Sequence, residues 1–568
     1  MRVNNVNHYV KLPRVSDRRF TQFKIPHGLH TTFNAGKLVP IYCKEVYPNT
    51  RIKLNWRTVT RLLTPKYPTM DNANLDVFFF FVPNIEIWDK WKNFMGENDT
   101  DYWTEKGVYQ VPQQSVPLYT ANDISSSSVP CRGGVGDLAD YLGVPIVKAD
   151  KASTSPVVSV SALPFRAYVK IWNDWFRDEN FQEPCKLTLG NNSRDFPLSS
   201  AWANQPSDYV SRAELGAELC PVDKYKDYFT SLLPQPQKGD PVSLPLSSSS
   251  APLVHGGTSQ IIELLPSTSL AYSKSPVVAS KSAGASSVVT LSSLDTTATD
   301  GNPRDLFKMD YQVDLSAVSS VTVEQLRLAF ATQRFLEMSA VGGTRYVELV
   351  SYMFGANCPD EYLHRSRFLG GKSIPLNITP ITQLSGSATE SLGQVGAFSN
   401  TVGDDFAFDE KFEEHGFIMG LVCVRTAHSY SQGLPKFFMK KQKLDYYFPI
   451  FAHLGEQPVY NKEIYLQGNA EDDEVIGYQM AWDELRHTPT RSSGYLRMGA
   501  PGALEQWTYA DKFDSLPVLG AAFIEETKDN IARTLSVTEY THQFISDWFF
   551  NEEVYQILPA DSTPKLVG

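Results

Sequence analysis

The stretch Gly370-Gly371-Lys372-Ser373 comes closest, of all segments in the chain, to a phosphate-binding loop. Such a loop cradles phosphate oxygens with consecutive backbone N–H groups, and it needs a leading glycine five residues before the second one. Ser366 occupies that position, so the cradle is incomplete and we expect a turn between strands. Gly133-Gly134-Val135-Gly136 likewise lacks the later glycine and the preceding strand of a dinucleotide-binding fingerprint.

Metal-binding and nucleophilic patterns are also missing from the sequence. It contains neither a His-Glu-x-x-His zinc helix nor a Gly-x-Ser-x-Gly nucleophile elbow. The ten histidines are dispersed, and we expect His415 and His428, on either side of an apolar run, to be structural residues. The four acidic residues 471–474 have diverging side chains that cannot converge on one cation, so a solvated loop is favoured. We therefore predict no catalytic site, no metal and no cofactor.

The six cysteines, and the lack of long apolar runs, indicate a protein that folds in a reducing compartment. No Cys-x-x-Cys pair occurs, so we expect reduced, mostly buried thiols. The first twenty residues are polar and basic, unlike a secretory signal, and the most apolar run, 77–82, is too short to cross a membrane. The cysteines are Cys43, Cys131, Cys185, Cys220, Cys358 and Cys423.

Positive charge is concentrated near the start of the chain. Residues 1–66 contain 13 Lys and Arg but two acidic residues, a charge of +11, whereas the remainder carries −22. This asymmetry suggests an anionic partner for the basic part, although a solvated tail without a partner explains the charge equally well. We predict that residues 1–30 form a basic N-terminal arm. Its basic residues are Arg2, Lys11, Arg14, Arg18, Arg19 and Lys24.

Two aromatic residues, Trp56 and Tyr67, lie close to this basic region. Aromatic rings stack on unpaired nucleic-acid bases, so both are candidates for such contacts. Large aromatic side chains are more often part of a core, and we favour core packing for both residues.

The elements that must position these residues are short strands spread over the whole chain. Alternating or continuous apolar residues predict strands, and the run 74–83 is expected to be buried on both faces. The predicted strands are Thr32–Tyr42, Arg51–Leu63, Asn74–Pro83, Gly416–Val424, Tyr446–Phe451 and Thr541–Leu558.

A few helices interrupt the strands. A short helix is expected from Asn84, as N-cap, to Gly96. Aromatic residues at helical spacing predict a second helix over Pro164–Arg177, with its stripe in the core. A third helix begins near Thr322, breaks at Gly342-Gly343, and is followed by helical spacing from Tyr346 to Phe354.

This pattern favours a β-sandwich or jelly roll with insertions over a βαβ repeat. Residues 247–300 stand apart, because they contain 15 Ser and six Thr but five charged residues among 54. A segment this long needs a role or is disordered, and its β-branched pairs favour a folded, exposed insertion.

Several sequence blocks, in order along the chain, resemble the major capsid proteins of the Microviridae, most closely the gokushovirus-like branch. The first is Asn74-Leu75-Asp76-Val77-Phe78 through Pro83-Asn84 with Trp88 and Trp91. The others include Leu163–Tyr168 with Trp172–Asp178, Asp227–Thr230 with Leu233–Gly239, Gly342–Tyr346, Leu369–Gly371 with Pro375–Asn377, Gly416–Arg425 with Gln432–Pro435, and Gly477–Gln479.

The resemblance implies a fold and a function. The fold would be a single eight-stranded antiparallel jelly roll over residues 31–568, with long insertion loops and a few short helices. The chain would self-assemble into the smallest (T=1) icosahedral shell of a small single-stranded-DNA bacteriophage, in the host bacterial cytoplasm. The insertion at 247–315 would form a surface protrusion at the threefold axes and contribute to host attachment.

The resemblance also implies partners. These are further copies of the chain, the packaged single-stranded DNA, a small basic internal virion protein, a pilot protein and a host cell-surface receptor. A basic arm on an acidic body is consistent with an arm that neutralises DNA phosphates, so we expect Arg14, Arg18 and Arg19 on the inner surface of the shell. We also expect the isolated chain to associate in a strongly concentration-dependent manner.

Two other classes of protein remain as alternatives. A secreted or surface carbohydrate-binding β-sandwich, an adhesin or glycosidase, would explain the aromatic content and the Ser/Thr-rich segment, and it would require an export signal. A nucleic-acid enzyme would use the basic region, but no metal or phosphate motif supports it.

Overall fold

The computed structural model describes residues 20–97, 109–117, 135–145, 157–191, 213, 218–240, 253–255, 279–281, 289–291, 311–313, 323–356, 359–360, 364–382, 395–536 and 542–559. The chain divides into two compact units. The first consists of residues 1–238 and 337–568, and the second of residues 239–336. The candidate interaction surfaces described below lie in the first unit.

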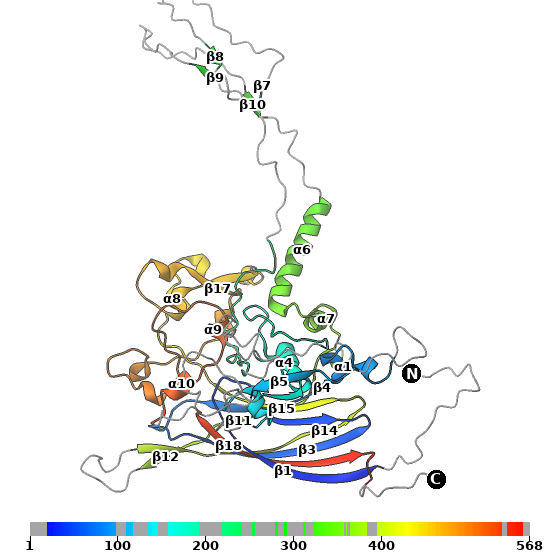
Figure 1. Ribbon diagram of the computed structural model, residues 1–568. Coiled ribbons are helices and arrows are strands. Elements are labelled where there is room, and N and C mark those ends of the chain that lie inside the picture. Colours follow the sequence, from blue (N-terminus) through cyan, green and yellow to red (C-terminus); the bar gives the residue numbers. More distant parts are fainter. Residues whose placement is uncertain are drawn as a thin grey trace, which may run out of the picture. The chain divides into compact units, whose positions relative to one another are not determined.

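Two four-stranded antiparallel sheets form the body of the first unit (Figure 1). Sheet 1 has the strand order β1-β18-β3-β14, and sheet 2 has the order β11-β4-β15-β2. The chain is therefore mainly β, as the sequence predicts. The strands of sheet 1 are β1 (Thr21–Phe33), β18 (Phe544–Gln556), β3 (Thr50–Leu62) and β14 (Thr401–Phe412). Those of sheet 2 are β11 (Arg367–Pro375), β4 (Ala73–Pro83), β15 (Gly416–Thr426) and β2 (Val39–Val46).

The pairing of these strands is nested along the chain. The first strand, β1, pairs with the last, β18, and the second, β2, pairs with the last but one, β15. Strand β3 pairs with β14, and β4 pairs with β11. Further pairings, of β18 with β3 and of β15 with β4, complete the two four-stranded sheets. The N- and C-terminal parts of the chain are thereby joined in sheet 1, over the thirteen aligned pairs of β1 and β18.

The two faces of sheet 1 differ in polarity because successive side chains of a strand point to opposite faces. In β3, Leu54 and Trp56 point inward and are buried, whereas Arg57 and Arg61 point outward and are exposed. Figure 1 shows the helices of this unit on the side of sheet 2, and no described helix covers the outer face of sheet 1. One face of this sheet is therefore free of helices formed by the described residues.

The two inner strands of sheet 2, β4 and β15, are buried on both faces. Nearly every residue of β15 is buried, and β4 is buried at most positions on both faces, which confirms the prediction for Asn74–Pro83. Helix α4 (Leu163–Ile171) packs on these two strands and continues into a π-helical turn, η1 (Trp172–Phe176). Its predicted aromatic stripe is in the core, and Tyr168 and Trp172 are fully buried.

Two strand predictions are wrong. The stretch Thr32–Tyr42 is not one strand, because β1 ends at Phe33, β2 begins at Val39, and Gly36 turns the chain between them with φ +75°. The stretch Tyr446–Phe451 is not a strand, because a capping box at Gln442 and Asp445 and the proline at 449 favour two 3-10 turns instead, η6 (Lys443–Asp445) and η7 (Pro449–Phe451).

The helix predicted from Asn84 to Gly96 is two short helices, α1 (Asn84–Ile87) and α2 (Trp91–Phe94), and Pro83 rather than Asn84 precedes the first. The predictions around residues 322–354 are confirmed: helix α6 spans Val323–Gly342, and α7 spans Tyr346–Phe354. No helix among the described residues is both long and apolar enough to cross a lipid bilayer.

The remaining elements of the first unit are short. Three hairpin-like pairs are β5 (Gln113–Pro117) with β6 (Val157–Ser161), β12 (Ile378–Thr382) with β13 (Val395–Ser399), and β16 (Glu456–Tyr460) with β17 (Val475–Met480). The short helices are α3 (Leu138–Tyr141), α8 (Asn461–Ile464), α9 (Ala521–Ile524) and α10 (Asp529–Ala532). The 3-10 turns besides η6 and η7 are η5 (Lys436–Phe438), η8 (Ala470–Asp473), η9 (Asp483–Leu485), η10 (Gly494–Leu496) and η11 (Glu505–Trp507).

The second unit contains two short antiparallel pairs. Strand β7 (Leu253–His255) pairs with β10 (Tyr311–Val313), and β8 (Ala279–Lys281) pairs with β9 (Val289–Leu291). The predicted Ser/Thr-rich insertion, 247–315, falls within this unit. Most of its residues lie outside the described part of the chain.

Gly36 is expected to be essential to the junction between the two sheets. Its N–H donates to Val424 O, its carbonyl accepts from Val222 N, and a Cβ here would overlap the Glu526 carbonyl. We expect Gly36→Ala to lower the free energy of unfolding by about 1–3 kcal/mol, measured by urea unfolding. Gly502→Ala is the matched control, because Gly502 has the same φ of +75° but open space around it. Equal losses in the two variants would show that the backbone overlap is unimportant.

Candidate interaction surfaces

The predicted N-terminal arm is described only at its end. Arg2, Lys11, Arg14, Arg18 and Arg19 lie outside the described residues. Lys24 lies in β1, so residues 21–30 of the predicted arm are a strand of sheet 1. Its ammonium group lies 3.5 Å from the carboxylate of Glu553, which is opposite it on β18. An exposed ion pair of this kind contributes little to stability, and the carboxylate of Glu553 offsets the positive charge of Lys24.

The uncovered face of sheet 1 carries a second set of basic residues, which the sequence analysis did not single out. Strand β3 presents Arg51, Lys53, Arg57 and Arg61 on this face. Arg51 is neutralised by two hydrogen bonds of 2.7 Å to Asp409. Lys53, Arg57 and Arg61 form no ion pair with any described residue, although Asp404 of β14 lies opposite Arg57 and Glu553 of β18 lies opposite Lys53. Alternation of basic residues in the predicted strand 51–63 was the signal that could have identified them.

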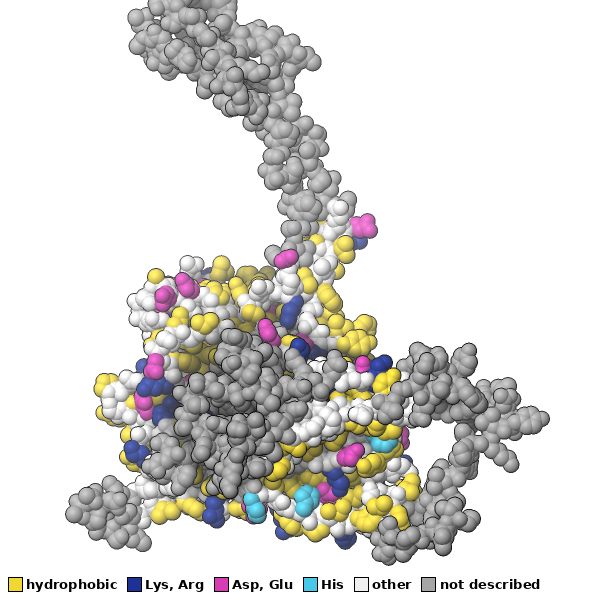
Figure 2. All heavy atoms as spheres, in the orientation of Figure 1, with side chains coloured by type: hydrophobic (Ala, Val, Ile, Leu, Met, Phe, Trp, Pro, Cys, Tyr) yellow, Lys and Arg dark blue, Asp and Glu magenta, His cyan; other side chains and the backbone are white. Residues whose placement is uncertain are grey.

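Aromatic and amide side chains accompany these charges. The register places Phe549 opposite Arg57 and Asn551 opposite Asn55, with Phe406 on the other neighbouring strand. Together with Trp56 and two carboxylates, those of Asp404 and Asp405, these residues line a hollow of about 600 Å³ in the sheet face. Both phenylalanine rings are half exposed. The lower margin of Figure 2, where sheet 1 lies, shows basic, acidic, histidine and hydrophobic side chains interleaved. We call this surface, defined by Lys53, Asn55, Arg57, Arg61, Phe406, Phe549 and Asn551, the basic–aromatic face.

Trp56 is in the core, as favoured by the sequence analysis, whereas Tyr67 is only half-buried. Trp56 is 2% exposed, and its ring lies 5.6 Å from that of Trp548. Tyr67 stacks on Trp507 at 5.1 Å with an interplanar angle of 12°. The Trp56 ring is therefore not available to another molecule, and one face of the Tyr67 ring is covered by Trp507.

A buried charge cluster surrounds His428, just after β15. Its Nδ1 lies 3.0 Å from Asp511 Oδ2, and its Nε2 lies 2.8 Å from Glu526 Oε2. Lys224 Nζ lies 3.3 Å from the same Asp511 oxygen, and Asn530 donates to the other. We call these five residues the His428 cluster. Every partner is satisfied from within the chain, so the cluster connects four segments and has no open position for a substrate.

Burial and charge act in opposite directions on this cluster. Burial lowers the pKa of His428, but the hydrogen bonds to Asp511 and Glu526 outweigh it and raise the pKa to about 9. Burial raises the pKa of Asp511, but the His428 bond and the nearby positive charges hold it well below its usual range. His428 is therefore a charged structural residue, which agrees with the expectation that it is not a metal ligand.

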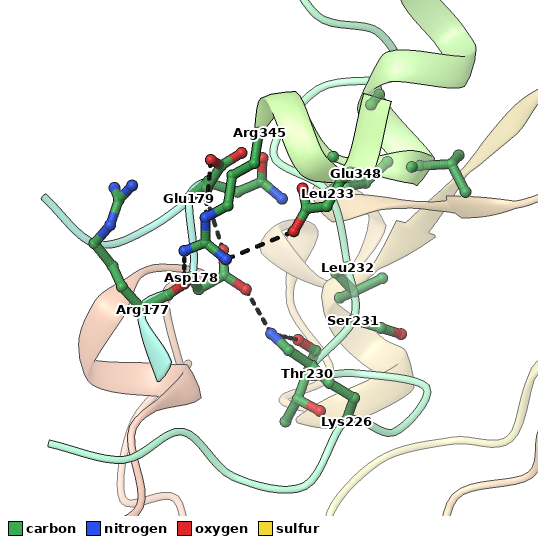
Figure 3. A pocket seen from close by; sticks show the side chains of 15 residues that line it. Arg177, Asp178, Glu179, Lys226, Thr230, Ser231, Leu232, Leu233, Arg345 and Glu348 are labelled. Carbon is green, nitrogen blue, oxygen red and sulfur yellow. Dashed lines mark hydrogen bonds and ion pairs between the residues drawn. The ribbon is translucent and has the colours of Figure 1, made fainter. Parts of the chain in front are cut away.

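Figure 3 shows a pocket of about 280 Å³ in which the labelled charged residues other than Arg177 form ion pairs. Arg345 Nε lies 3.2 Å from Glu179, and its Nη1 lies 3.5 Å from Glu348. Lys226 lies 2.5 Å from Asp178. Burial raises the pKa of Glu348, and Arg345 beside it opposes this effect. The three carboxylates are paired with Arg345 and Lys226, and no nucleophile faces a base. These residues therefore hold neighbouring segments of the chain together and do not form a catalytic site.

This pocket explains one of the sequence blocks. Thr344 donates from its hydroxyl to Glu179 at 2.8 Å, and Arg345 donates to the carbonyl of Arg177 at 2.7 Å. Gly343 has φ +86°, and a Cβ there would overlap the Glu348 carboxylate. The block Gly342–Tyr346 therefore docks the start of α7 against the end of η1.

The other motifs have structural roles. Gly370-Gly371-Lys372-Ser373 lies inside β11 beside a register shift, rather than in the expected turn, because Gly370 and Gly371 closely approach backbone carbonyls of neighbouring strands. In the acidic run 471–474, Asp472 accepts from two backbone N–H groups and Asp473 pairs with Lys462. His415 packs against Trp91. No cluster of metal-ligating side chains occurs among the described residues.

The described cysteines are free thiols. Cys185, Cys220 and Cys423 are buried, and Cys43 is exposed. The sulfur atoms of Cys185 and Cys220 are 3.6 Å apart and unbonded. This agrees with the expectation of reduced, mostly buried cysteines. Cys131 and Cys358 lie outside the described residues.

A mainly β body with buried charges satisfied internally and a large uncovered polar–aromatic sheet face defines a structural protein that acts through its surfaces. The comparisons with known proteins identify its family. The family model of the capsid protein (F protein) matches residues 13–566. The chain therefore belongs to the capsid protein (F protein) family.

The relatives are similar over nearly their whole length. The chain is 34% identical to capsid protein VP1 of Spiroplasma virus 4, over 96% of this chain and 95% of that protein. It is 33% identical to capsid protein VP1 of Bdellovibrio phage phiMH2K, over 100% and 98%. It is also 33% identical to capsid protein VP1 of Chlamydia phage 1, over 99% and 98%.

These matches confirm the resemblance to the gokushovirus-like Microviridae. The protein is a major capsid protein of a small single-stranded-DNA phage, located in the virion, and its role is structural rather than enzymatic. The alternatives of a carbohydrate-binding β-sandwich and of a nucleic-acid enzyme are thereby set aside.

Proposed function

We propose that the eight strands of sheets 1 and 2 form a single jelly roll, and that this body is the unit of a T=1 icosahedral shell. Nested pairing supports the jelly roll, because a long antiparallel hairpin that is rolled up pairs its first strand with its last and its fourth with its fifth. Identical subunits around several symmetry axes require complementary patches on one chain, and exposed apolar loops are consistent with this requirement.

The basic–aromatic face and residues 1–30 then form the surface that contacts packaged single-stranded DNA. The observation that carries this proposal is the row of basic residues Lys53, Arg57 and Arg61, which form no ion pair with a described residue, on a sheet face that no described helix covers. The basic arm leads directly into β1, which is the edge strand of the same sheet. Arm and face therefore contribute positive charge to one side of the subunit, and we place Arg2, Lys11, Arg14, Arg18, Arg19 and Lys24 on the inner surface of the shell.

Single-stranded nucleic acid suits the chemistry of this face. Lys and Arg bind phosphates and release counterions without regard to sequence. Half-exposed rings such as Phe406 and Phe549 offer surfaces on which bases stack, and each stacked base contributes about 1–3 kcal/mol. Asn55 and Asn551 add amide donors and acceptors between the rings.

Neutralising the free charges is expected to weaken DNA binding and its salt dependence. In the variant Lys53→Gln/Arg57→Gln/Arg61→Gln, the slope of log affinity against log salt should decrease in magnitude by about 2, since each single-strand phosphate contact contributes about 0.7. Fluorescence anisotropy of a labelled single-stranded oligonucleotide at several salt concentrations measures this slope. The matched control replaces Arg486, Arg491 and Arg497, three exposed arginines outside sheet 1, with glutamine. An equal decrease in the control would place DNA binding elsewhere.

Host contact and the internal partners belong to the same proposal. Residues 247–315 lie in the second unit, whose Ser/Thr-rich composition suits an exposed protrusion at the threefold axes that meets a host receptor. Outside its first 66 residues the chain carries −22, which favours contact with a small basic internal protein, alongside the pilot protein of the virion. Electron microscopy of assembled particles tests the protrusion, the basic internal protein and the pilot protein. A protrusion built from other residues would contradict the assignment of residues 247–315.

A further inference from the structure

One loop of the first unit exposes an unusual number of large apolar side chains. It spans residues 436–454, contains the 3-10 turns η5, η6 and η7, and is called the aromatic loop here. Ile450 is 85% exposed, Leu444 64% and Phe438 63%. Lys441 and Lys443 are exposed in the same loop. Exposed apolar surface of this density marks an interaction site in a stable protein.

The aromatic loop is held in one conformation by its own hydrogen bonds. Asp445 accepts from the backbone N–H groups of Lys441 and Gln442 at 2.8 and 2.7 Å. Trp482 donates from its indole to the carbonyl of Phe451 at 2.8 Å, and its ring packs against Tyr447. A preformed loop loses little conformational entropy on binding, so its exposed side chains are available for a specific contact.

A hollow whose charge is opposite to that of the aromatic loop lies at the turn between β14 and β15. It has a volume of about 420 Å³ and an apolar floor that includes Ile85, Trp91 and Met95. Its rim carries Glu413 and Glu414. Glu97 adds a third exposed carboxylate, against a single lysine, Lys92. We call this the acidic hollow.

The two surfaces are complementary but cannot meet within one chain. The aromatic loop is joined to the region of α8 and η9, where Lys436 and Lys440 pair with Glu484 at 3.7 and 3.5 Å. The acidic hollow adjoins α1 and α2. Figure 1 shows α8 and α1 on opposite sides of the first unit. Loop and hollow therefore suit two copies of the chain that contact each other head to tail, and such contacts form rings when the rotation between copies closes.

We propose that the aromatic loop of one copy docks into the acidic hollow of the next copy. Lys441 and Lys443 lie against Glu413 and Glu414 of the partner, and the apolar side chains of the loop cover the apolar floor. This contact deepens the shell-forming function proposed above and rests on it. Opposite charges at the rim of such an interface guide the encounter and determine its register.

Charge exchange tests the contact in the purified full-length chain by sedimentation velocity. Lys441→Glu/Lys443→Glu and Glu413→Lys/Glu414→Lys should each raise the concentration for half-association by about tenfold or more, since like charges then face each other. The chain carrying all four substitutions should recover association, because opposite charges face each other again. Lys186→Glu/Arg497→Glu is the control, with two exposed reversals outside both surfaces. Thermal unfolding of every variant verifies that it is folded.

Specific cross-linking gives a second readout that does not depend on affinity. A chain with Lys443→Cys mixed with a chain with Glu414→Cys should form disulfide-linked dimers under oxidised glutathione, well above the level given by either variant alone. Absence of this product, or a folded four-substitution chain that does not recover association, would overturn the contact. Loss of oligonucleotide binding with unchanged association in Lys441→Glu/Lys443→Glu would instead assign the loop to nucleic acid. A wild-type chain that never associates would contradict the shell-forming function itself.

Discussion

The variant His428→Gln is expected to lose about 3–5 kcal/mol of the free energy of unfolding, as found when one partner of a buried ion pair is removed. Asp511 and Glu526 are both buried and both bonded to the imidazole, so a neutral side chain leaves two carboxylates facing each other without the charge between them. The measurement is chemical unfolding of the full chain, below the concentration at which it associates.

His487→Gln is the matched control for this prediction. His487 also contacts a carboxylate, Asp483 at 3.0 Å, but its side chain is 63% exposed. Solvent screens such a pair, and its loss should change stability by less than about 1 kcal/mol. Similar losses in the two variants would show that burial of the His428 cluster does not determine its energetic importance.

The same cluster predicts how stability depends on pH. The pKa of His428 is about 9 in the folded chain and 6.5 as an unperturbed group. Because folding raises it, the stabilisation is fully present below pH 6.5 and is lost as the pH rises through about 9. At 1.36 kcal/mol per unit this amounts to roughly 3 kcal/mol. The pKa of Asp511 is lowered by folding, so the stabilisation that Asp511 contributes is lost in the opposite direction, as the pH falls below the usual pKa of an aspartate.

Unfolding measured at several pH values from 6.5 to above 9 checks this dependence. The wild-type chain should become less stable across that range, and His428→Gln should show a flatter profile because the titrating group is gone. A variant profile parallel to that of the wild type would contradict a charged His428.

Trp548→Ala is expected to destabilise the chain by about 3–5 kcal/mol, the range for removing a large aromatic side chain from a core. Trp548 is fully buried in β18, with its ring 5.6 Å from Trp56 and 6.3 Å from Phe550. Strand β18 is an inner strand of sheet 1, between β1 and β3. A cavity here therefore weakens the packing beneath three strands at once.

Trp548→Phe should cost much less than the alanine variant. The indole Nε1–H of Trp548 is buried and has no hydrogen-bond acceptor among the described residues, so phenylalanine removes an unsatisfied donor. Trp172→Phe is the matched comparison, because Trp172 donates to the carbonyl of Pro221 at 2.8 Å and is equally buried. Urea unfolding should rank Trp548→Phe as the milder of the two. The reverse order would show that shape rather than hydrogen bonding determines the cost.

Strand identity was accessible from the sequence where side-chain periodicity is strong. The alternation in 51–63 and the apolar runs at 74–83 and 416–424 are confirmed as β3, β4 and β15. Strands were predicted wrongly where residues that favour turns outweigh a strand-like composition. At 32–42 a single glycine turn divides the stretch, and at 446–451 aromatic residues are exposed rather than buried in a strand.

The candidate surfaces were only partly predictable. The sequence identified the positive charge of residues 1–66, but it singled out only the six basic residues of the arm formed by residues 1–30. Which charges remain free depends on cross-strand neighbours hundreds of residues away, such as Asp409 for Arg51 and Glu553 for Lys24. Composition carries no information about such neighbours.

By itself, the sequence determined the class of structure, the family resemblance and the absence of known catalytic motifs, because these depend on residue type and local spacing. The tertiary structure decided which residues meet. It joined His428 to Asp511 and Glu526, placed the last strand between β1 and β3, and left one sheet face and one aromatic loop uncovered. Periodicity reports which side of an element is buried, whereas contacts over long sequence separations are determined only when the whole chain folds into sheets.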